Sequence, residues 1–168
     1  MTSKIYIVDR VLHWVSAFLL LFMLMNLSSQ LHHANWDIKG QLLHRQDAVE
    51  IHAIMGIILV VLTIGRIVYS HLSKPRLNRV QPKSIWHQRF IQITHVALYI
   101  CIFSLVATGI AMINHYEIPL TIYGIEFSPD KEGFYDTFPS IHSIHLQLRE
   151  AIWWLIAIHF VGIMYAKR

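Results

Sequence analysis

Charged residues are scarce in this sequence. Asp, Glu, Lys and Arg make up 14% of its 168 residues, whereas hydrophobic residues make up 55%; an average soluble domain carries about 25% charged residues. The charges are largely excluded from four stretches, at about 11–27, 51–69, 91–113 and 144–165. Each is close to the roughly 20 residues with which an α-helix crosses a bilayer. We therefore expect an all-α membrane protein, a four-helix transmembrane bundle in a single domain over 1–168.

Several other features are missing. The only cysteine, Cys101, lies in the third apolar stretch, which excludes a disulfide or an iron-sulfur cluster within the chain. Neither G-x-G-x-x-G nor G-x-x-x-x-G-K-[ST] occurs, so no known nucleotide-binding loop is present. The net charge of +4 comes from basic residues beside the apolar stretches, which argues against nucleic acid as a partner. The first apolar stretch lacks a small-residue cleavage site, and we interpret it as a retained helix.

The remaining charges predict an orientation. The segment 70–90 contains no acid and five basic residues, namely Lys74, Arg76, Arg79, Lys83 and Arg89. The segment 114–143 has the opposite character, with Glu117, Glu126, Asp130, Glu132 and Asp136 against Lys131 alone. Because basic loops stay on the cytoplasmic side, we expect 70–90 and both termini to be cytoplasmic. The apolar segment 118–127 is too short to span and is expected at the outer interface.

Twelve histidines are many for a chain of this length, and five lie within or at the edges of apolar stretches: His13, His52, His95, His145 and His159. An ionisable side chain at membrane depth is costly and usually functional. Any one of them alone is equally consistent with a hydrogen bond between helices. The others, apart from His142, are expected to be solvated in loops or near helix ends: His32, His33, His44, His71, His87 and His115.

Taken together, the membrane histidines fit one geometry. His145 and His159 are 14 residues apart, which places them on one helix face about 21 Å apart. His52 is expected at the outer level with His145, and His13 at the inner level with His159. Two such pairs are what two bis-histidine haems in a four-helix bundle require, whereas zinc would gather its ligands at one level. His142 is a competitor for the outer position, but it lies roughly 100° off the shared face.

These motifs resemble those of the bacterial cytochrome b561 family. The likeness covers VLHWVSA with His13, EIHAIMGIILVVLTIGR with His52, THVALYICIF, SIHLQLREAIWWLIAIHFVG with His145 and His159, and the outer segment PLTIYGIEF. The resemblance implies two haem b groups, held by His13 with His159 and by His52 with His145. It also implies a multi-pass protein of the bacterial inner membrane that exchanges electrons with quinone. Some members resemble superoxide oxidases that reduce ubiquinone, although an acidic outer loop repels an anion such as superoxide.

Three further residues are candidates for contacts with haem. Arg149 follows His145 by one turn and is expected to pair with a haem propionate or to form an ordinary surface ion pair. Arg66 lies 14 residues after His52 and either serves the inner haem or reaches the lipid headgroups. Gly56, one turn below His52, either lets a flat macrocycle approach or serves helix packing.

His95 and Tyr99 form an i, i+4 pair near the inner start of the third apolar stretch. One interpretation is that His95, with no iron to bind, donates a hydrogen bond to a quinone carbonyl. The other is that it bonds to a propionate or to a neighbouring helix.

The sequence thus predicts electron transfer between the quinone pool and a periplasmic one-electron donor or acceptor, with superoxide as a candidate. Both axial positions of each iron are occupied by histidine, so oxygen is not expected to bind the metal, and no side chain is assigned a catalytic role. Two alternatives are a cytochrome b anchor subunit that relays electrons within a larger redox complex, and a histidine-based ion transporter.

Overall fold

Four long helices make up most of the protein. The structure is a computed structural model, and it describes residues 2–27, 41–73 and 84–167. Among these residues, four helices are long and apolar enough to cross a membrane. The helices are α1 (Thr2–Phe22), continued by the short π-helix η1 (Met23–Leu27), α3 (Gln41–Ser73), α4 (Ile85–Ile113), the short α5 (Lys131–Asp136) and α6 (Phe138–Lys167). The predicted all-α, four-helix membrane bundle is confirmed.

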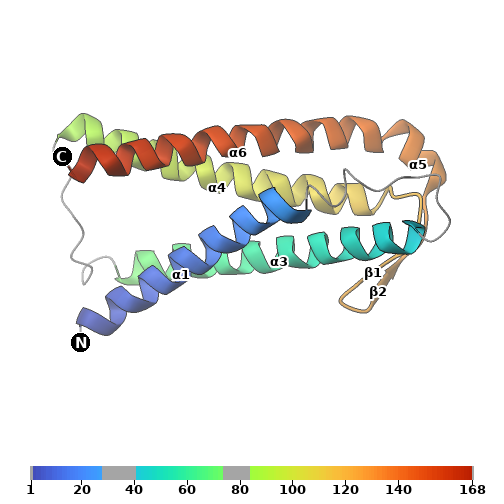
Figure 1. Cartoon of the computed structure of the whole chain (residues 1–168), viewed down its shortest axis with the longest axis horizontal. Coiled ribbons are helices and arrows are strands. Elements are labelled where there is room, and N and C mark those ends of the chain that lie inside the picture. Colours follow the sequence, from blue (N-terminus) through green and yellow to red (C-terminus); the bar gives the residue numbers. More distant parts are fainter. Residues whose placement is uncertain (1, 28–40, 74–83, 168) are drawn as a thin grey trace.

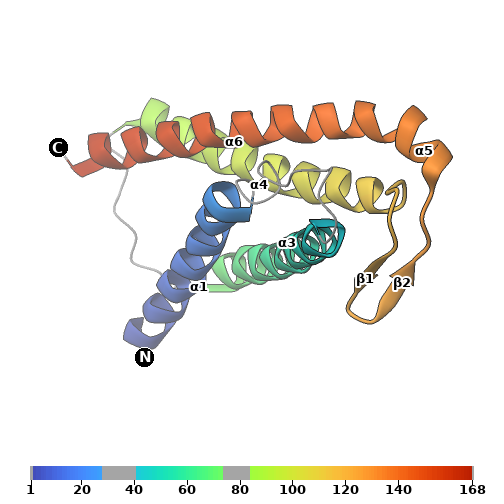
Figure 2. The ribbon, with the colours of Figure 1, turned by 45° about the vertical axis from the view of Figure 1, so that its right-hand side comes forward.

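The helices are arranged as two packed pairs. α4 and α6 lie side by side along their length, and α1 crosses α3 at an angle (Figures 1 and 2). Contacts between α3 and α4 join the two pairs. Both ends of the chain lie at one end of the bundle, and the only two strands in the described part of the chain lie at the other end (Figure 1).

The hydrophobic core lies midway along the bundle, and every long helix or its extension contributes to it. Its buried members are Met23, Leu59, Cys101, Ile102 and Ile152. Ile152 lies seven residues from both His145 and His159, and seven residues are close to two helical turns. The core therefore forms an apolar layer between the levels of these two histidines.

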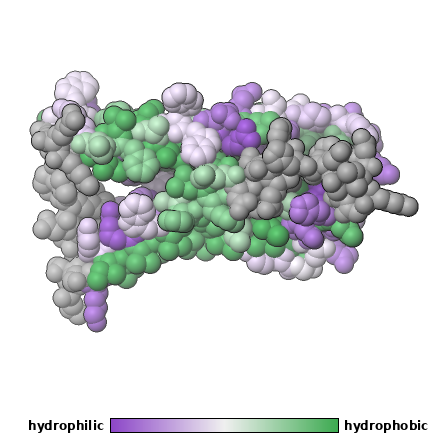
Figure 3. Space-filling model, in the orientation of Figure 1, coloured by the Kyte–Doolittle hydropathy of each residue, from purple (hydrophilic) through white to green (hydrophobic). Residues whose placement is uncertain are grey.

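Many large apolar side chains point outward. Phe18, Ile93 and Trp154 are among them, with 69–74% of their surface exposed. Figure 3 shows a hydrophobic surface over much of the helical region. Exposed apolar surface on this scale is unfavourable in water and is the surface that a hydrocarbon environment covers.

The end of the bundle opposite the termini is closed by a small cap. β1 (Leu120–Ile122) pairs with β2 (Ile125–Phe127) in an antiparallel hairpin. The two-residue turn between them has positive φ at both Tyr123 (51°) and Gly124 (78°), as the tight turns of twisted hairpins require. Leu120 and Ile122 are buried, so this apolar segment packs on the bundle instead of forming a further helix.

A buried arginine ties the cap to α3. Arg45 is only 5% exposed; its Nε donates to the Tyr116 hydroxyl over 2.8 Å, and its Nη1 pairs with the Glu117 carboxylate at 2.6 Å. Burial raises the pKa of the Tyr116 hydroxyl, and Arg45 opposes that rise. A second link from α3 is the Glu50 carboxylate, which accepts from the backbone N–H of Thr121 at 2.5 Å.

The cap also has an internal ion pair. The Asp130 carboxylate accepts from the Gly133 backbone N–H at the start of α5 and lies 2.9 Å from Nδ1 of His115. These two hydrogen bonds, that from Gly133 first, hold the pKa of Asp130 below its usual value. His115, which was predicted to be solvated, is thus hydrogen-bonded to Asp130.

The helices are longer than the apolar stretches that predicted them. α3 begins at Gln41, so the prediction of a loop over 28–50 is wrong for its last ten residues, which are helical. Residues 28–40, with His32 and His33, lie outside the described residues. α4 begins at Ile85, where Ser84 caps it, and α6 begins at Phe138. Pro139 lies in the first turn of α6, where a missing N–H costs nothing. Hydropathy locates the hydrocarbon-spanning part of a helix, but helical hydrogen bonding continues beyond it.

We predict that Arg45→Met destabilises the protein, because it leaves the Tyr116 hydroxyl and the Glu117 carboxylate without their buried donor. The expected loss is about 1–3 kcal/mol in the free energy of unfolding. Thermal unfolding in detergent, followed by circular dichroism, measures it. Lys131→Met, which removes an exposed cation of the same cap, is the control and should change stability by less than about 0.5 kcal/mol. Equal stability of the two variants would show that Arg45 does not hold the cap.

Candidate functional site

The predicted outer histidine pair is in contact. The His52 ring on α3 and the His145 ring on α6 have centroids 6.3 Å apart and planes inclined at 66°. His142, the competing residue, is exposed and instead stacks on Phe138 at 5.5 Å. The structure thus favours His145 over His142 as the partner of His52.

Thr108 on α4 contacts the His145 ring. Its hydroxyl lies 2.9 Å from Nδ1 of His145 and within hydrogen-bond distance of the backbone carbonyls of Ser104 and Leu105. A hydroxyl that donates to one of those carbonyls has its oxygen left to accept from Nδ1–H of His145. In that tautomer the lone pair of the ring is on Nε2, the nitrogen left to bind a metal. The contact joins two helices, so helical periodicity alone does not predict it.

His52 supplies an unsatisfied nitrogen at the same level. Its Nδ1 is buried and has no hydrogen-bond partner in the described part of the chain. A buried polar atom without a partner costs about 1–3 kcal/mol unless a ligand or water meets it. The outer pair therefore has the character of a ligand site.

The predicted inner pair is also in contact, and a third ring joins it. His13 on α1 and His159 on α6 have ring centroids 6.4 Å apart, with planes at 67°. The His95 ring on α4 lies 4.9 Å from the His159 ring. The sequence treated His95 as a separate site, whereas the structure brings it to the inner histidines.

His95 forms a hydrogen bond within its own helix. Its Nδ1 lies 2.7 Å from the carbonyl oxygen of Ile91, one turn earlier, and a carbonyl only accepts. Nδ1 therefore carries the proton, and Nε2 of the neutral ring is an acceptor. Tyr99 is partly buried one turn further along α4.

The two candidate arginines differ in their surroundings. Arg66 lies near the inner pair, where its charge acts on both His13 and His159. Arg149 pairs with Glu150 at 2.8 Å, and its side chain is 35% exposed. This is the ordinary surface ion pair that was the alternative reading of Arg149.

Two glycines line the helix contacts near the outer pair. A Cβ on Gly56 would lie 3.7 Å from Cε of Met23, so Gly56 packs against η1 in this structure. A Cβ on Gly109 would lie 3.8 Å from Cε1 of His145. Gly109 is thus the glycine that borders a predicted ligand.

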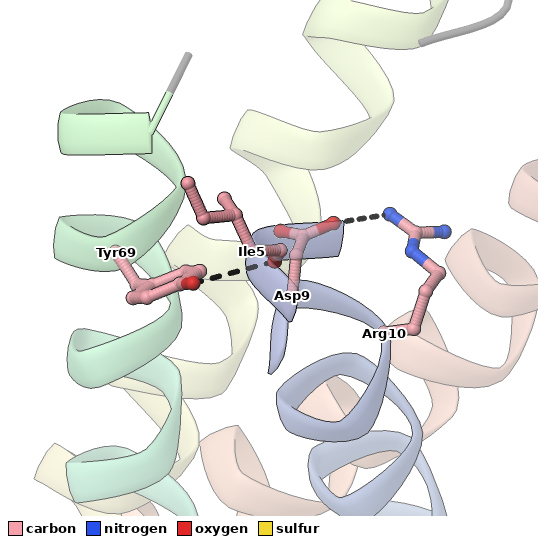
Figure 4. A network of polar contacts seen from close by, with 4 residues as sticks. All are labelled: Ile5, Asp9, Arg10 and Tyr69. Carbon is pink, nitrogen blue, oxygen red and sulfur yellow. Dashed lines mark hydrogen bonds and ion pairs between the residues drawn. The ribbon is translucent and has the colours of Figure 1, made fainter. Parts of the chain in front are cut away.

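Asp9 is a buried acid near the start of α1. It lies one turn before His13, is 2% exposed and pairs with the Arg10 guanidinium of the same helix at 2.5 Å (Figure 4). Beside it, the Tyr69 hydroxyl on α3 donates to the carbonyl of Ile5 at 3.3 Å (Figure 4). The Tyr69 bond joins the start of α1 to the end of α3. A single acid among apolar residues gave no periodic signal by which to find it.

The paired rings suit a metal bound between two imidazoles. Two metal–nitrogen bonds of about 2 Å each, together with the distance from each nitrogen to its ring centre, place opposed imidazole centroids roughly 6 Å apart. Both observed separations have this size. Within the described residues, no group of three or more His, Cys, Asp or Glu side chains is placed to hold a metal ion. Pairs of histidines at two levels fit the axial ligation of haem better than a four-ligand zinc site.

Comparison with known protein families gives a match that covers almost the whole chain. The family described as "Prokaryotic cytochrome b561" matches residues 6–168. The chain belongs to this family. No curated protein and no solved structure matches it. As a prokaryotic cytochrome b561, the protein is a multi-pass membrane b-type cytochrome that binds haem and takes part in electron transfer.

We predict that Thr108→Val weakens haem binding in this cytochrome, because the His145 ring loses the acceptor that fixes its proton and orientation. Loss of such a partner typically lowers metal affinity by about 10–100-fold. Haem content per chain in detergent, measured during titration with a competing haem-binding protein, tests it. Thr63→Val is the control, since the buried Thr63 hydroxyl donates only to the Leu59 carbonyl. Equal haem retention in both variants would exclude this role for Thr108.

Proposed function

We propose that this cytochrome holds two haem b groups, one between His52 and His145 and one between His13 and His159, and passes electrons between the quinone pool and a one-electron partner outside the cell membrane. The observation that carries the proposal is the pair of histidine contacts, with ring separations of 6.3 and 6.4 Å at two levels of one bundle. The two levels are 14 residues apart on α6, or about 21 Å. This spacing is suited to electron transfer across most of a bilayer.

Haem supplies one-electron chemistry at its iron when bound, and the chain supplies position and surroundings. His145 is oriented by Thr108, so its Nε2 is presented in one tautomer. The core around Leu59 and Ile152 separates the two levels with apolar side chains. Such a layer excludes water from the space between the sites and lowers the local dielectric constant.

The orientation follows from charge. In the proposed topology the end of the bundle with both termini is cytoplasmic, because α3 ends and α4 begins there, on either side of the basic run in the sequence, and the hairpin of the acidic segment lies at the opposite end (Figure 1). The His13–His159 pair is then the inner site, and the cap faces the periplasm. The proposed location is the bacterial inner membrane.

We place quinone exchange at the inner pair, beside His95 and Tyr99. The polar groups of His95 and Tyr99 are suited to hydrogen bonding with a quinol such as ubiquinol. The contact of His95 with the His159 ring, at 4.9 Å, would bring that quinol next to the inner haem ligand.

The cap favours a partner with a basic surface. Two of its acids, Glu117 and Asp130, are paired within the structure. Glu126, Glu132 and Asp136 are exposed and form no ion pair among the described residues. Exposed carboxylates attract a protein with a complementary positive patch and speed its association. Superoxide is the other candidate, but Arg149, the cation expected to attract it, is paired with Glu150.

The proposal predicts the haem count and the ligand pairs. The dithionite-reduced minus oxidised spectrum of the purified protein should correspond to two haems b per chain, and His52→Ala or His159→Ala should each remove one. His142→Ala, an exposed histidine on α6, is the control and should retain both. Haem lost equally from all three variants would contradict the pairing. A colourless protein would favour the ion transporter, and a stable co-purifying subunit would favour the anchor function.

The quinol role of His95 is tested separately. His95→Ala should slow reduction of the haems by ubiquinol by about 10–100-fold, the usual contribution of a positioned proton acceptor being at least this large. Both haem bands should remain, since His95 is not a proposed ligand. Stopped-flow absorption at the haem bands measures the rate, with His71→Ala, an exposed histidine at the same end of the bundle, as the control. Loss of the inner haem in His95→Ala would refute the quinol role.

A further inference from the structure

A pocket of about 700 Å³ opens between the start of α4 and the end of α6. The start of α4 and the end of α6, which line it, lie at the end of the bundle that contains both termini (Figure 1). Its polar lining comes from the first turn of α4 and includes Ser84, Trp86, His87 and Arg89. None of these residues belongs to the histidine pairs described above, so the pocket is a separate feature of the molecule.

Several hydrogen-bond donors meet at this pocket. Ser84 caps α4 by accepting from the His87 backbone N–H at 3.2 Å, which leaves its hydroxyl hydrogen available. The Arg89 guanidinium lies over the Trp86 ring at 5.7 Å, and within the described residues it forms no ion pair. The N-terminus of a long helix adds a partial positive charge. This combination of a cation, neutral donors and a helix N-terminus is suited to a phosphate group.

A buried histidine gives an independent indication of a ligand. His87 is only 6% exposed, and its ring is packed edge-on against Tyr165 at 5.2 Å. Its Nε2 lies 3.4 Å from the carbonyl of Gly162, which only accepts, so Nε2 carries the proton. Nδ1 is then an acceptor, and it has no partner among the described residues. The sequence predicted a solvated His87, and that prediction is wrong.

The unsatisfied nitrogen distinguishes between possible ligands. A quinone offers only carbonyl oxygens, which accept and cannot satisfy Nδ1. A headgroup that contains both a phosphate and a hydroxyl satisfies both requirements, because the phosphate accepts from Arg89 and the hydroxyl donates to His87.

The rest of the pocket is apolar and suits an acyl chain. Phe90, Ile93 and Val161 line it, and all three are exposed on the outer surface of the bundle. Phe90 also contacts α6 closely, since a Cβ on Gly162 would lie 3.1 Å from its ring. The exposed Trp86 has the amphipathic character that places tryptophan at the membrane interface. A ligand of this pocket is therefore an amphiphile.

The basic stretch that precedes Ser84 in the sequence favours an anionic amphiphile. The ten residues that precede Ser84 include four basic residues and no acid in sequence. Basic segments beside a membrane helix attract anionic headgroups by about 1 kcal/mol for each Lys or Arg near the surface. A zwitterionic lipid gains little from this attraction.

We propose that the pocket is a specific site for an anionic phospholipid with a hydroxylated headgroup, of the phosphatidylglycerol class. Arg89, Trp86 and Ser84 hold the phosphate, the headgroup hydroxyl meets His87, and an acyl chain lies along Phe90 and Val161. The bound lipid fastens the start of α4 to the end of α6 and thus supports the helices that carry His95 and His159. This site is independent of which quinone or outer partner the cytochrome uses.

Native mass spectrometry of the delipidated, haem-loaded full chain tests the site with equimolar phosphatidylglycerol and phosphatidylcholine. The wild type should retain one phosphatidylglycerol molecule, with about tenfold preference over phosphatidylcholine, which corresponds to 1.4 kcal/mol in binding free energy. Arg89→Gln should abolish the preference, whereas Lys4→Gln, an exposed cation at the same end, should keep it. An unchanged haem spectrum shows that each variant is folded. No preference in the wild type, or an unchanged preference in Arg89→Gln, overturns the proposal.

Further comparisons test the contact with His87 and identify the class of ligand that the pocket binds. Phosphatidylmethanol has the same charge as phosphatidylglycerol but no headgroup hydroxyl, and the wild type should prefer phosphatidylglycerol. His87→Phe should remove this preference. A preference that persists in His87→Phe contradicts the contact between His87 and the headgroup hydroxyl. Displacement of the lipid by equimolar inorganic phosphate would assign the pocket to the free ion instead. Displacement by ubiquinone would assign it to a quinone, and either result overturns the lipid site.

Discussion

The placement of imidazole rings inside an apolar bundle is the constraint on which the rest of the structure depends. A polar ring at membrane depth is costly without partners, and the bundle meets this by bringing rings from different helices together. α6 carries one histidine of each pair, and Ile152 lies halfway between them. The same helix face therefore presents one proposed haem ligand, the core and the second proposed ligand in turn. α1 and α3 each supply the opposite ring, so the two helix pairs are joined at two levels.

The end of the bundle that carries the hairpin shows how charged side chains are paired where the bundle leaves the apolar region. Arg45 is buried beneath the hairpin and neutralises Glu117, while His115 pairs with Asp130. The acids used for structure are thereby separated from the exposed carboxylates available to a partner. This arrangement gives the cap a fixed shape and a negative outer surface, which are the properties that steer a basic partner to one position.

The end of the bundle that contains both termini is richer in polar groups. Asp9 with Arg10, Arg66, and His95 all lie near the His13–His159 pair or one turn from it. The proton exchange with a quinol that we propose at this end requires such groups, whereas the one-electron transfer that we propose at the other end does not. The pocket at the start of α4 lies at this same end, and a lipid there would stabilise the α4–α6 contact beside the proposed quinol site.

The sequence by itself determined the four spans, the shared face of His145 and His159, and the family to which the chain belongs. These features depend on hydropathy and on the period of one helix, which are local properties. Only the tertiary structure decided where α3 begins, that Thr108 meets His145, that His95 joins the inner pair, and that His87 is buried. Each of these depends on how two helices are rotated and spaced against one another. Helical period gives the face on which a side chain lies, but the neighbouring helix decides what that side chain meets.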